Sequence, residues 1–492
     1  MTSDRVVVVG SGPCGAVAAL ELVRRGVPVT LLESGSVRPH GLLVKVAGHT
    51  VLRRFGSGTL QHDGGFTPEL DPGTVWYRDL TPGGLSNYWT AAVPRFAPPD
   101  FGHGVDVDAV HRWPITYDDL APRYAQVERL LDVTGLAQST PNLPSNDVRF
   151  HARLPTDWAD FVAPARTLGH DLVPLPMAKG RPWMLVRRGT EFNSWTAIID
   201  RLAHEPAFEV RTGAHALRLR WARAAGRVDA IEYLDRRRGE RVTLPGRAFV
   251  VAAGALNSTR LLQTSTSADF PTGLGDAHGV LGRYLHDHPK DWWMFETDRP
   301  LRLPAHPVYM TRCAPGRSDP LLATSWTIGL ANRRDRPRTY VGMRGTRFAA
   351  QVFGTMVPDP DHRVCVDDGP VDDLGQRPMR IRSAYDEATR HTMRAARDRL
   401  REVLAGGSCS ARPLVGPDVD LRPGESVHYG GTVRMHARPE LGMVDGHGRL
   451  HAVPNVYVVD SSVFTTGPEK NPTLTAMAIA VHAMAALAGT LR

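Results

Sequence analysis

The sequence predicts an α/β fold that begins with a Rossmann-like, dinucleotide-binding unit. Three observations in the first 35 residues lead to this prediction. Residues 5–9 form a β-branched run, which is typical of a strand buried on both faces. This run passes directly into a GxGxxG turn at residues 10–15. A second strand is expected at residues 27–32, and it is followed by the acidic residue Glu33.

Each element of this unit has its own physical role. Gly10 is expected to form the tight turn, Gly12 to let the backbone approach a pyrophosphate, and Gly15 to let the next helix pack closely on the sheet. An amphipathic helix is predicted over residues 16–25, ended by Gly26. The phosphates are expected at the positive N-terminus of this helix.

Glu33 lies 18 residues after Gly15, at the end of the second predicted strand. Its carboxylate is expected to accept hydrogen bonds from both ribose hydroxyls and to repel a 2′-phosphate. NAD and FAD share this fingerprint, so the unit alone leaves the dinucleotide open. The alternative is a glycine-rich turn without a ligand.

Length and composition indicate a globular protein of 492 residues and 53.9 kDa, large enough for two domains. The net charge is +8 and the pI is near 9.5. Arginine is spread along the chain, and its densest run, at residues 236–238, reads as a solvated turn. Nucleic-acid binding is therefore not predicted, because it depends on clustered cations.

No disulfide framework, structural zinc site or membrane span is expected. The cysteines show no CxxC pair or regular spacing. The longest apolar run, residues 473–487, is about four turns long and shorter than the ~18 residues of a spanning helix. The N-terminus lacks the features of a signal peptide, which predicts a soluble, cytoplasmic protein. The four cysteines are Cys14, Cys313, Cys365 and Cys409.

Three later stretches carry further motifs. Residues 250–262 read as a strand that turns at Gly254 into a helix, residues 282–289 read GRYLHDHP, and residues 428–435 read HYGGTVRM. In order and spacing these stretches resemble the glucose-methanol-choline (GMC) oxidoreductases, a family of flavoproteins that oxidise alcohols with FAD. The resemblance runs from residue 5 to residue 487 and implies that the dinucleotide is FAD.

The sequences of residues 83–90 and 471–475 resemble those of the pyranose oxidase and glycoside oxidase branch of the family, which acts on sugars. Pyranose oxidases often place a histidine bonded to the flavin where this chain has Tyr88. A histidyl-FAD bond at this position is thereby excluded, and non-covalent FAD is expected.

The resemblance also implies a discontinuous organisation. An FAD-binding domain of GMC type is expected from residues 1–95, 190–290 and 425–492. An α+β substrate-binding domain, built on a mainly antiparallel sheet, is expected from residues 96–189 and 291–424. Within the latter, Thr116 is predicted to cap a helix that runs through Tyr124.

Alcohol oxidation by a flavin removes a hydroxyl proton and sends a hydride to flavin N5. Histidine suits the role of base, because its ordinary pKa is ~6.5. His428 occupies the family's HxxGT position, and Gly430 and Gly431 allow the chain to pass close to another group. Asn471 is the expected partner that orients the hydroxyl. The plainer alternatives are a surface histidine and an ordinary helix cap.

The resemblance implies a set of FAD-contacting residues. Asp460 has the alternative of a strand-end Asx turn, and Thr90 that of a plain strand threonine. Residues 472–473 begin a helix whose free amides are expected to stabilise negative charge on the flavin. The full set is Gly10, Gly12, Gly15, Glu33, Gly84, Ser86, Asn87, Thr90, Ala253, Gly254, Asp460, Ser461, Pro472 and Thr473.

No metal is predicted. His286, Asp287 and His288 together resemble a ligand cluster, but the triplet matches the family's structural DHP segment and no further ligands follow at suitable spacing. Aromatic residues of the substrate domain form either a sugar platform or, as favoured here, core packing. These are Trp292, Trp293, Tyr309, Trp326 and Tyr340.

The resulting hypothesis is FAD-dependent oxidation of a hydroxyl of a sugar or glycoside to the carbonyl, with His428 as general base. One alternative is the primary alcohol of an amino sugar, for which acid clusters are expected in the pocket. Further alternatives are a non-sugar alcohol and a flavin-binding protein without catalysis. The expected partners are a small-molecule alcohol and an electron acceptor, O2 or another molecule, with no nucleic acid and no membrane.

Overall fold

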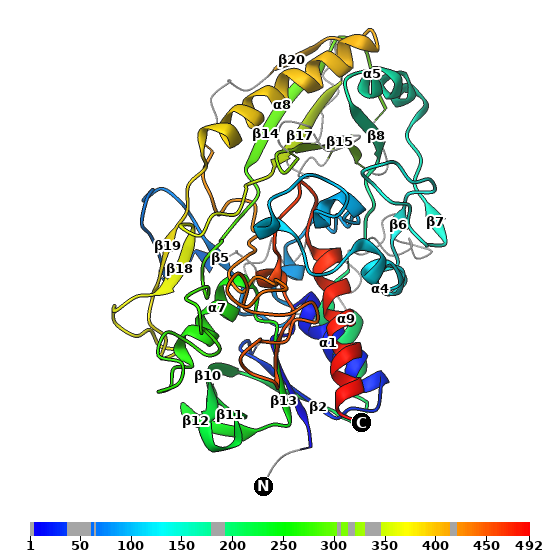
Figure 1. The fold of residues 1–492 in the computed structure, drawn as a ribbon. Coiled ribbons are helices and arrows are strands. Elements are labelled where there is room, and N and C mark those ends of the chain that lie inside the picture. The colour runs from blue at the N-terminus through cyan, green and yellow to red at the C-terminus, as the bar shows by residue number, and fades with distance from the viewer. Residues whose placement is uncertain are drawn as a thin grey trace.

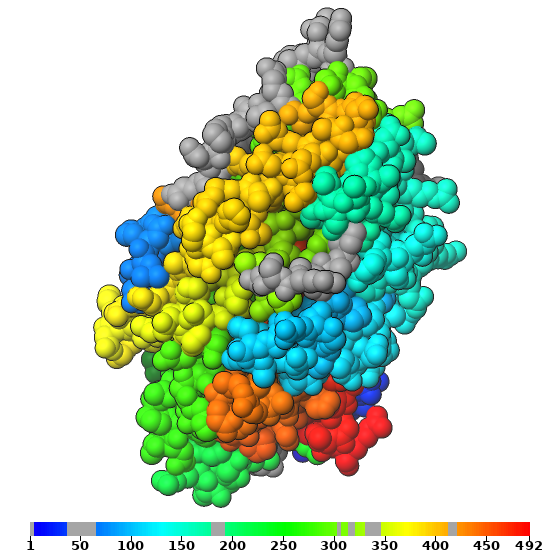
Figure 2. All heavy atoms as spheres, turned by 45° about the horizontal axis from the view of Figure 1, so that its top comes forward, coloured from blue at the N-terminus to red at the C-terminus, as the bar shows by residue number. Residues whose placement is uncertain are grey.

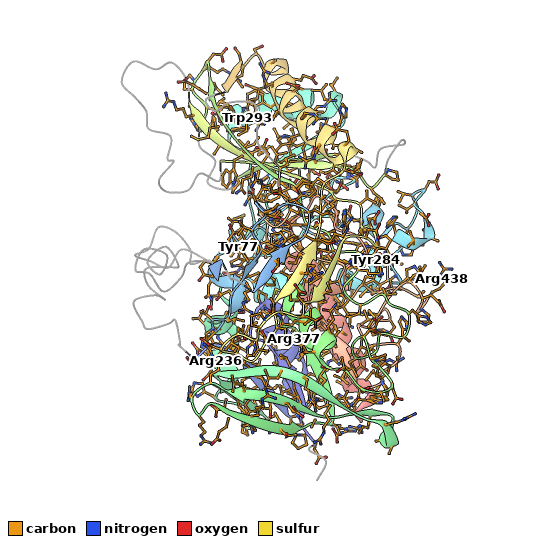
Figure 3. The ribbon with its side chains drawn as sticks, turned by 90° about the vertical axis from the view of Figure 1, so that its left-hand side faces the viewer. Tyr77, Arg236, Tyr284, Trp293, Arg377 and Arg438 are labelled. Carbon is orange, nitrogen blue, oxygen red and sulfur yellow. The ribbon has the colours of Figure 1, made fainter. Side chains whose placement is uncertain are left out.

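A computed structural model describes residues 4–36, 61–62, 65–178, 192–302, 307–312, 320–329, 346–413 and 421–492. Two large sheets lie towards opposite ends of the long axis of the molecule (Figure 1). Figure 3 labels Trp293 at one end, Arg236 near the other, and Tyr284 between them.

The first sheet has five parallel strands in the order β21-β13-β1-β2-β9. Helix α1 (Pro13–Arg24) connects β1 to β2, and the chain then turns at Gly26 with φ of 77°. The predicted βαβ unit and its α/β class are therefore confirmed. The strands are β1 (Val6–Val9), β2 (Val29–Glu33), β9 (Phe208–Thr212), β13 (Ala248–Val251) and β21 (Val456–Val458).

A three-stranded antiparallel sheet shares the hydrophobic cluster of the parallel sheet. Residues 236–238 form an exposed turn in it, as predicted, so these arginines are solvated. Helix α7 (Ala255–Thr264) packs against its first strand. The strands are β10 (Ala214–Ala222), β11 (Arg227–Asp235) and β12 (Glu240–Pro245).

Helix α9 (Thr473–Thr490) is longer than the expected four turns. Its 18 residues have a mean hydropathy of 1.5, so by length and composition it passes as a candidate membrane span. However, 67% of it is buried inside the protein, where it packs against α1 and α4 (Tyr117–Leu130). A helix that is apolar on all sides fits such a core position.

The second large sheet has six antiparallel strands in the order β20-β14-β17-β16-β15-β8. Helix α8 (Glu387–Gly406) buries Met393, Leu400 and Val403 against it in a separate hydrophobic cluster. The expected mainly antiparallel sheet is confirmed. The strands are β8 (His170–Pro174), β14 (Lys290–Thr297), β15 (Val308–Arg312), β16 (Thr324–Ile328), β17 (Arg347–Gly354) and β20 (Ala411–Pro413).

Shorter elements complete the described chain. On the surface, α8 (yellow to orange) lies beside the α5 segment (Figure 2). The helices are α5 (Val162–Thr167), α6 (Asp200–Leu202), the π-helical turn η5 (Trp195–Ile199) and the 3-10 turns η1 (Gly84–Asn87), η2 (Pro98–Phe101), η3 (Ala109–His111), η4 (Thr156–Phe161), η6 (Arg223–Ala225) and η8 (Ser461–Val463). The strands are β3 (Gln61–His62), β4 (Phe66–Pro68), β5 (Tyr77–Arg78), β6 (Thr134–Gly135), β7 (Phe150–His151), β18 (Arg363–Val366) and β19 (Met379–Arg382).

Helix α4 begins as predicted. Thr116 accepts a hydrogen bond from the backbone N–H of Asp119, whose carboxylate accepts one from the backbone of Thr116 in return. The buried residues Leu120, Tyr124 and Val127 of α4 belong to the same hydrophobic cluster as the parallel sheet. The division into two discontinuous domains stays a prediction.

Two minor expectations can be followed in the described part of the chain. Cys14, Cys365 and Cys409 are free, whereas Cys313 lies outside the described residues. Trp293, Tyr309 and Trp326 are buried, which confirms core packing for these three. Trp292 is 40% exposed, and Tyr340 lies outside the described residues.

Candidate active site

The glycine-rich turn after β1 has the geometry of a phosphate-binding turn. Gly10 has φ of 98°, a conformation that favours glycine. A Cβ atom on Gly15 would collide with the carbonyl oxygen of Gly10, so glycine is required where α1 approaches the turn. A Cβ on Gly12 would meet no atom within 4 Å. The backbone at Gly12 therefore borders open space at the N-terminus of α1, where a pyrophosphate fits.

A second glycine turn lies over the first. The backbone N–H of Gly83 donates to Ser11 Oγ at 2.9 Å. A Cβ on Gly84, whose φ is 52°, would lie 3.5 Å from the Cα of Gly12. The segment that carries the predicted residues 84–90 is thereby held against the phosphate-binding turn.

Glu33 closes β2 and points back to the same turn. Its carboxylate accepts hydrogen bonds from Ser11 N at 3.1 Å, Ser11 Oγ at 2.5 Å and Gly35 N at 2.7 Å. Burial raises the pKa of Glu33 to about 7, although these donors act in the opposite direction. Ribose hydroxyls would add donors that favour the ionised form.

The side chains of Ser86 and Asn87 are engaged within their own turn. Ser86 Oγ donates to the carbonyl of Gly83 at 2.6 Å, and Asn87 Nδ2 donates to Thr81 Oγ1 at 2.9 Å. Thr90 is exposed. These contacts shape the turn, and a direct contact of these side chains with a cofactor stays a prediction.

Asp460 ties its own segment, residues 460–462, to residues 254–258 in what we name the Asp460 junction. Its carboxylate accepts from Gly254 N at 3.0 Å, Ser258 Oγ at 2.5 Å, Ser462 N at 3.0 Å and Ser462 Oγ at 2.6 Å. The Asx-type cap considered for Asp460 is thus present, together with a link to the β13–α7 turn. Gly254 has φ of 84°, and a Cβ there would meet nothing within 4 Å.

The remaining predicted FAD residues lie around this junction. Ala253 donates its N–H to Ser258 Oγ at 3.1 Å, and Ser461 Oγ donates to the carbonyl of Tyr429 at 2.7 Å. Pro472 is the N-cap residue of α9, which starts at Thr473 without a side-chain cap. Open space at two glycine turns and uncapped helix amides suit an FAD, so the described residues fit this cofactor.

Two loops far apart in the sequence pair beside this region. His286 and Gly430 exchange backbone hydrogen bonds of 3.1 Å and 2.9 Å. A Cβ on Gly430 would lie 2.6 Å from His286 Nε2, and one on Gly431 would collide with the carbonyl of Tyr284. The expectation that Gly430 and Gly431 permit a close approach is therefore confirmed, with the 284–286 segment as the neighbour.

Asp287 holds the loop that carries His428. Its buried carboxylate accepts from the backbone N–H groups of His428 and Gly424, both at 2.9 Å, and from Ser426 Oγ. Val427 has φ of 61°, which is a strained conformation for a β-branched residue. Asp287 thus acts as a structural clamp, and the loop keeps a conformation that positions His428.

His428 stands between two side chains. Its Nδ1 lies 3.0 Å from His288 Nδ1, and its Nε2 lies 3.5 Å from Asn471 Nδ2. Burial lowers the pKa of His428 well below 6.5, and electrostatic interactions with His288 and Lys290 lower it further. The ring is therefore neutral near pH 7 and able to accept a proton. A helix cap does not describe Asn471, because Pro472 holds that position.

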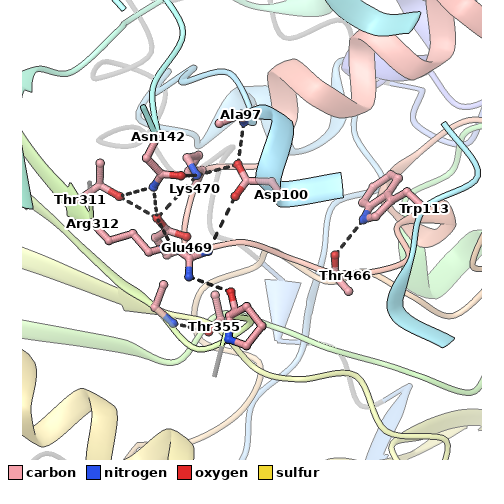
Figure 4. Close-up of polar contacts among 12 residues, drawn as sticks. Ala97, Asp100, Trp113, Asn142, Thr311, Arg312, Thr355, Thr466, Glu469 and Lys470 are labelled. Atoms are coloured by element: carbon pink, nitrogen blue, oxygen red, sulfur yellow. Dashed lines mark hydrogen bonds and ion pairs between the residues drawn. The ribbon is translucent and has the colours of Figure 1, made fainter. Parts of the chain in front are cut away.

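A buried ion network precedes Asn471 (Figure 4). Lys470 Nζ lies 2.6 Å from Asp100 Oδ2 and 3.6 Å from Glu469 Oε1. Arg312 lies within 4 Å of both carboxylates, and Asn142 bonds to Glu469 at 2.9 Å. Burial acts to raise the pKa of Glu469. The positive charges of Lys470 and Arg312 and a hydrogen bond from Thr311 outweigh this effect and hold that pKa at about 2. We name these residues the Lys470 network.

The structure brings together His428, Asn471 and one residue that sequence reasoning assigned only to structure, His288. The contact spans 140 residues of sequence, so no local spacing could reveal it. No group of three or more potential metal ligands occurs among the described residues, and the absence of a metal stays a prediction. The two carboxylates of the Lys470 network face two cations, so they form no acid cluster with excess negative charge.

Models of protein families match most of the chain. Residues 110–290 and 358–480 match the N- and C-terminal models described as GMC oxidoreductase, and residues 4–57 match an FAD binding domain. The chain is 30% identical to 6′′′-hydroxyparomomycin C oxidase of Streptomyces lividus, covering 100% of this chain and 93% of that one. It is 30% identical to paromamine 6′-oxidase of Streptomyces fradiae, covering 99% and 91%.

A more distant relative is C-glycoside 3-oxidase of Arthrobacter globiformis, 26% identical over 87% of this chain and 78% of that one. Among solved structures, pyridoxine 4-oxidase from Mesorbium loti superposes with a TM-score of 0.69, 19% identity and coverage of 98% and 99%. Formate oxidase superposes with a TM-score of 0.68 at 14% identity over the whole of both chains. These two structures support the fold.

Proposed function

Since the chain belongs to the GMC oxidoreductase family, we propose that it oxidises a hydroxyl group of a sugar or glycoside to the carbonyl. The enzyme is an FAD-dependent alcohol oxidoreductase. The observation that carries the proposal is the meeting of His428 and Asn471, a neutral imidazole and an amide, at the start of an uncapped helix.

His428 is the general base in this proposal. Its Nε2 takes the proton of the substrate hydroxyl, and Nδ2 of Asn471 donates to the hydroxyl oxygen and holds it in place. Bound FAD supplies the hydride acceptor at N5. The substrate thus loses a proton to the protein and a hydride to the cofactor, which leaves a carbonyl.

In this proposal the glycine turns at Gly12 and at Gly254 hold the cofactor. Gly12 and the amides of α1 bind the pyrophosphate, Glu33 binds the ribose, and the 253–254 turn with Ser461 lines the flavin chain. The first amides of α9, at residues 472–473, stabilise charge on the reduced flavin. Tyr88 carries no bond to the flavin, so denaturation by heat or acid is expected to release free FAD.

The primary alcohol of an amino sugar is the second candidate substrate. Two relatives that match nearly the whole chain bear the names 6′′′-hydroxyparomomycin C oxidase and paromamine 6′-oxidase, which favours this class. The balanced charges of the Lys470 network do not add to the case, because a cationic substrate would need unpaired carboxylates. The name C-glycoside 3-oxidase of another relative favours the first candidate.

An anaerobic titration tests both candidates. Free sugars, C- and O-glycosides, amino sugars and simple alcohols are added in turn while the flavin absorbance is followed. Bleaching by one class, lost in His428→Ala and unchanged in the distant surface variant Arg129→Ala, supports the proposal. A flavin-loaded protein that no alcohol bleaches contradicts it.

The electron acceptor and the location are part of the same proposal. Reoxidation of the reduced enzyme in air, followed as H2O2 formation, distinguishes an oxidase from a dehydrogenase that needs another acceptor. We propose a cytoplasmic location, which fractionation of the source cells tests.

A further inference from the structure

His288 lies in the loop of residues 282–289, two residues before β14 begins at Lys290, and its side chain is buried. Nδ1 of its ring lies 3.0 Å from His428 Nδ1. The ring also makes a hydrogen bond to the backbone of Pro468, and its Nε2 is the atom that faces this segment, since a Cβ on Gly467 would lie 3.4 Å from it. Both ring nitrogens of His288 therefore have a partner.

The partner at Pro468 determines where the proton of His288 lies. Proline has no backbone N–H, so its main chain can only accept a hydrogen bond. Nε2 of His288 must then donate, and in a neutral imidazole the other nitrogen, Nδ1, is an acceptor. His288 is neutral near pH 7, because burial lowers its pKa to about 4.

The position of the proton on His288 determines the position of the proton on His428. Its Nδ1 faces an acceptor at 3.0 Å, so Nδ1 must carry the proton. Since His428 is also neutral, its Nε2 then carries a lone pair, which faces Nδ2 of Asn471 at 3.5 Å. This is the tautomer that a general base needs when the substrate hydroxyl lies at Nε2.

We propose that His288 is a positioning residue that, held by the carbonyl of Pro468, fixes His428 in the tautomer with a proton on Nδ1 and a bare Nε2. The inference rests on the proposed role of His428 as base. In this arrangement His428 Nδ1 donates to His288 Nδ1, and His288 Nε2 donates to the carbonyl oxygen of Pro468.

Charged and titratable groups surround the two histidines. Lys290 acts electrostatically on His428, and Glu469 and His286 interact in the same way with His288. Glu469 and Lys470 anchor the short segment that presents the Pro468 carbonyl at one end and the Asn471 amide at the other. Residues 468–471 thus determine the tautomer of His428 through Pro468 and place Asn471 next to Nε2 of His428.

Two variants of His288 separate the hydrogen bond from the shape of the ring. His288→Phe keeps a ring but offers no acceptor to His428. His288→Asn keeps an acceptor, because its Oδ1 can occupy the place of Nδ1. Lys290→Met serves as the matched control, because it removes a charge near His428 without removing the acceptor.

The first measurement is of the tautomer and does not depend on turnover. The nitrogen-15 spectrum of histidine-labelled, FAD-loaded protein at pH 7.5 distinguishes protonated from bare ring nitrogens, with His428→Ala as the assignment control. We expect a protonated Nδ1 and a bare Nε2 on His428 in the wild type, in His288→Asn and in Lys290→Met, and a mixture of tautomers in His288→Phe. A bare Nδ1 on His428 in the wild type overturns the proposal.

The second measurement is the rate constant of anaerobic flavin reduction by an alcohol that bleaches the wild type. His288→Phe is expected to lower it about 100-fold with a change in substrate affinity below about threefold, and His288→Asn to restore at least a tenth of the wild-type rate. Equal rates in His288→Phe and the wild type overturn the positioning role. If no alcohol bleaches the wild type while its tautomer is as expected, the positioning stands and the proposed function fails.

Discussion

The Asp460 junction and the Lys470 network each fasten a turn of the candidate site, but with different chemistry. Asp460 receives four hydrogen bonds, all from neutral donors on Gly254, Ser258 and Ser462. The Lys470 network instead balances two buried carboxylates, Asp100 and Glu469, against two cations. The first holds the 254 turn of the cofactor region, and the second holds the segment before Asn471.

The difference shows how vulnerable each turn is to a single change. A carboxylate saturated by neutral donors loses a few hydrogen bonds when it is altered. A buried ion pair that loses one partner leaves an uncompensated charge in a medium of low dielectric constant, which costs more. The segment before Asn471 is therefore expected to be more sensitive to one substitution than the turn at Gly254.

The largest effect is expected for Lys470→Met. It leaves Asp100 and Glu469 with only Arg312, so the free energy of unfolding should fall by about 3–5 kcal/mol. Urea unfolding of the FAD-loaded protein measures this loss. Arg129→Met, which breaks an ion pair exposed on both sides, is the control and should cost less than about 1 kcal/mol. Equal losses in the two variants would remove the contrast.

A smaller effect is expected for Asp460→Asn. The amide keeps one acceptor oxygen, but it places a donor against the groups that now donate to Asp460. The free energy of unfolding should fall by about 2 kcal/mol, and FAD should bind about tenfold more weakly because the 254 turn loosens. Urea unfolding and FAD titration of the apoprotein check both values. A loss larger than that of Lys470→Met would reverse the ranking of the two regions.

The pH dependence of FAD binding sharpens the description of the cofactor region. In the apoprotein the pKa of Glu33 is raised to about 7, so its carboxyl is mostly protonated at pH 6 and mostly ionised at pH 8. Ribose hydroxyls favour the ionised form, so FAD should bind about tenfold more tightly at pH 8 than at pH 6. Equilibrium titration at the two pH values measures the ratio. The same pH dependence in Glu33→Gln would contradict this assignment.

The smallest effect on stability is expected for Gly12→Ala. A Cβ at this position meets no protein atom, so the free energy of unfolding of the apoprotein should change by less than about 0.5 kcal/mol. FAD binding should nevertheless weaken, because the methyl group enters the space of the pyrophosphate. Gly15→Ala is the comparison, since its Cβ collides with Gly10 and should destabilise the apoprotein. Unchanged FAD affinity in Gly12→Ala would place the phosphates elsewhere.

The elements of the N-terminal unit could be predicted with bounds within three residues of the observed ones, because the information that specifies them is local. The periodicity of the apolar residues predicted β1, α1 and β2, and the spacing of the glycines predicted the turn between β1 and α1. The cap at Thr116 and the exposed turn at residues 236–238 were also correct, for the same reason. The apolar run at residues 473–487 marked most of α9, which continues past this run to Thr490.

The proposed catalytic residues, His428 and Asn471, could also be identified from the motifs around them in the sequence. The protonation states and the relative orientation of these two side chains could not be predicted from the sequence. The contact of His288 with His428, the clamp of Asp287 on the 424–428 loop and the ions behind Asn471 join residues 100 or more positions apart. Such contacts form only when the folded chain brings distant segments together and excludes water, because burial is what shifts the pKa of His428 and gives a single hydrogen-bond direction its energetic weight.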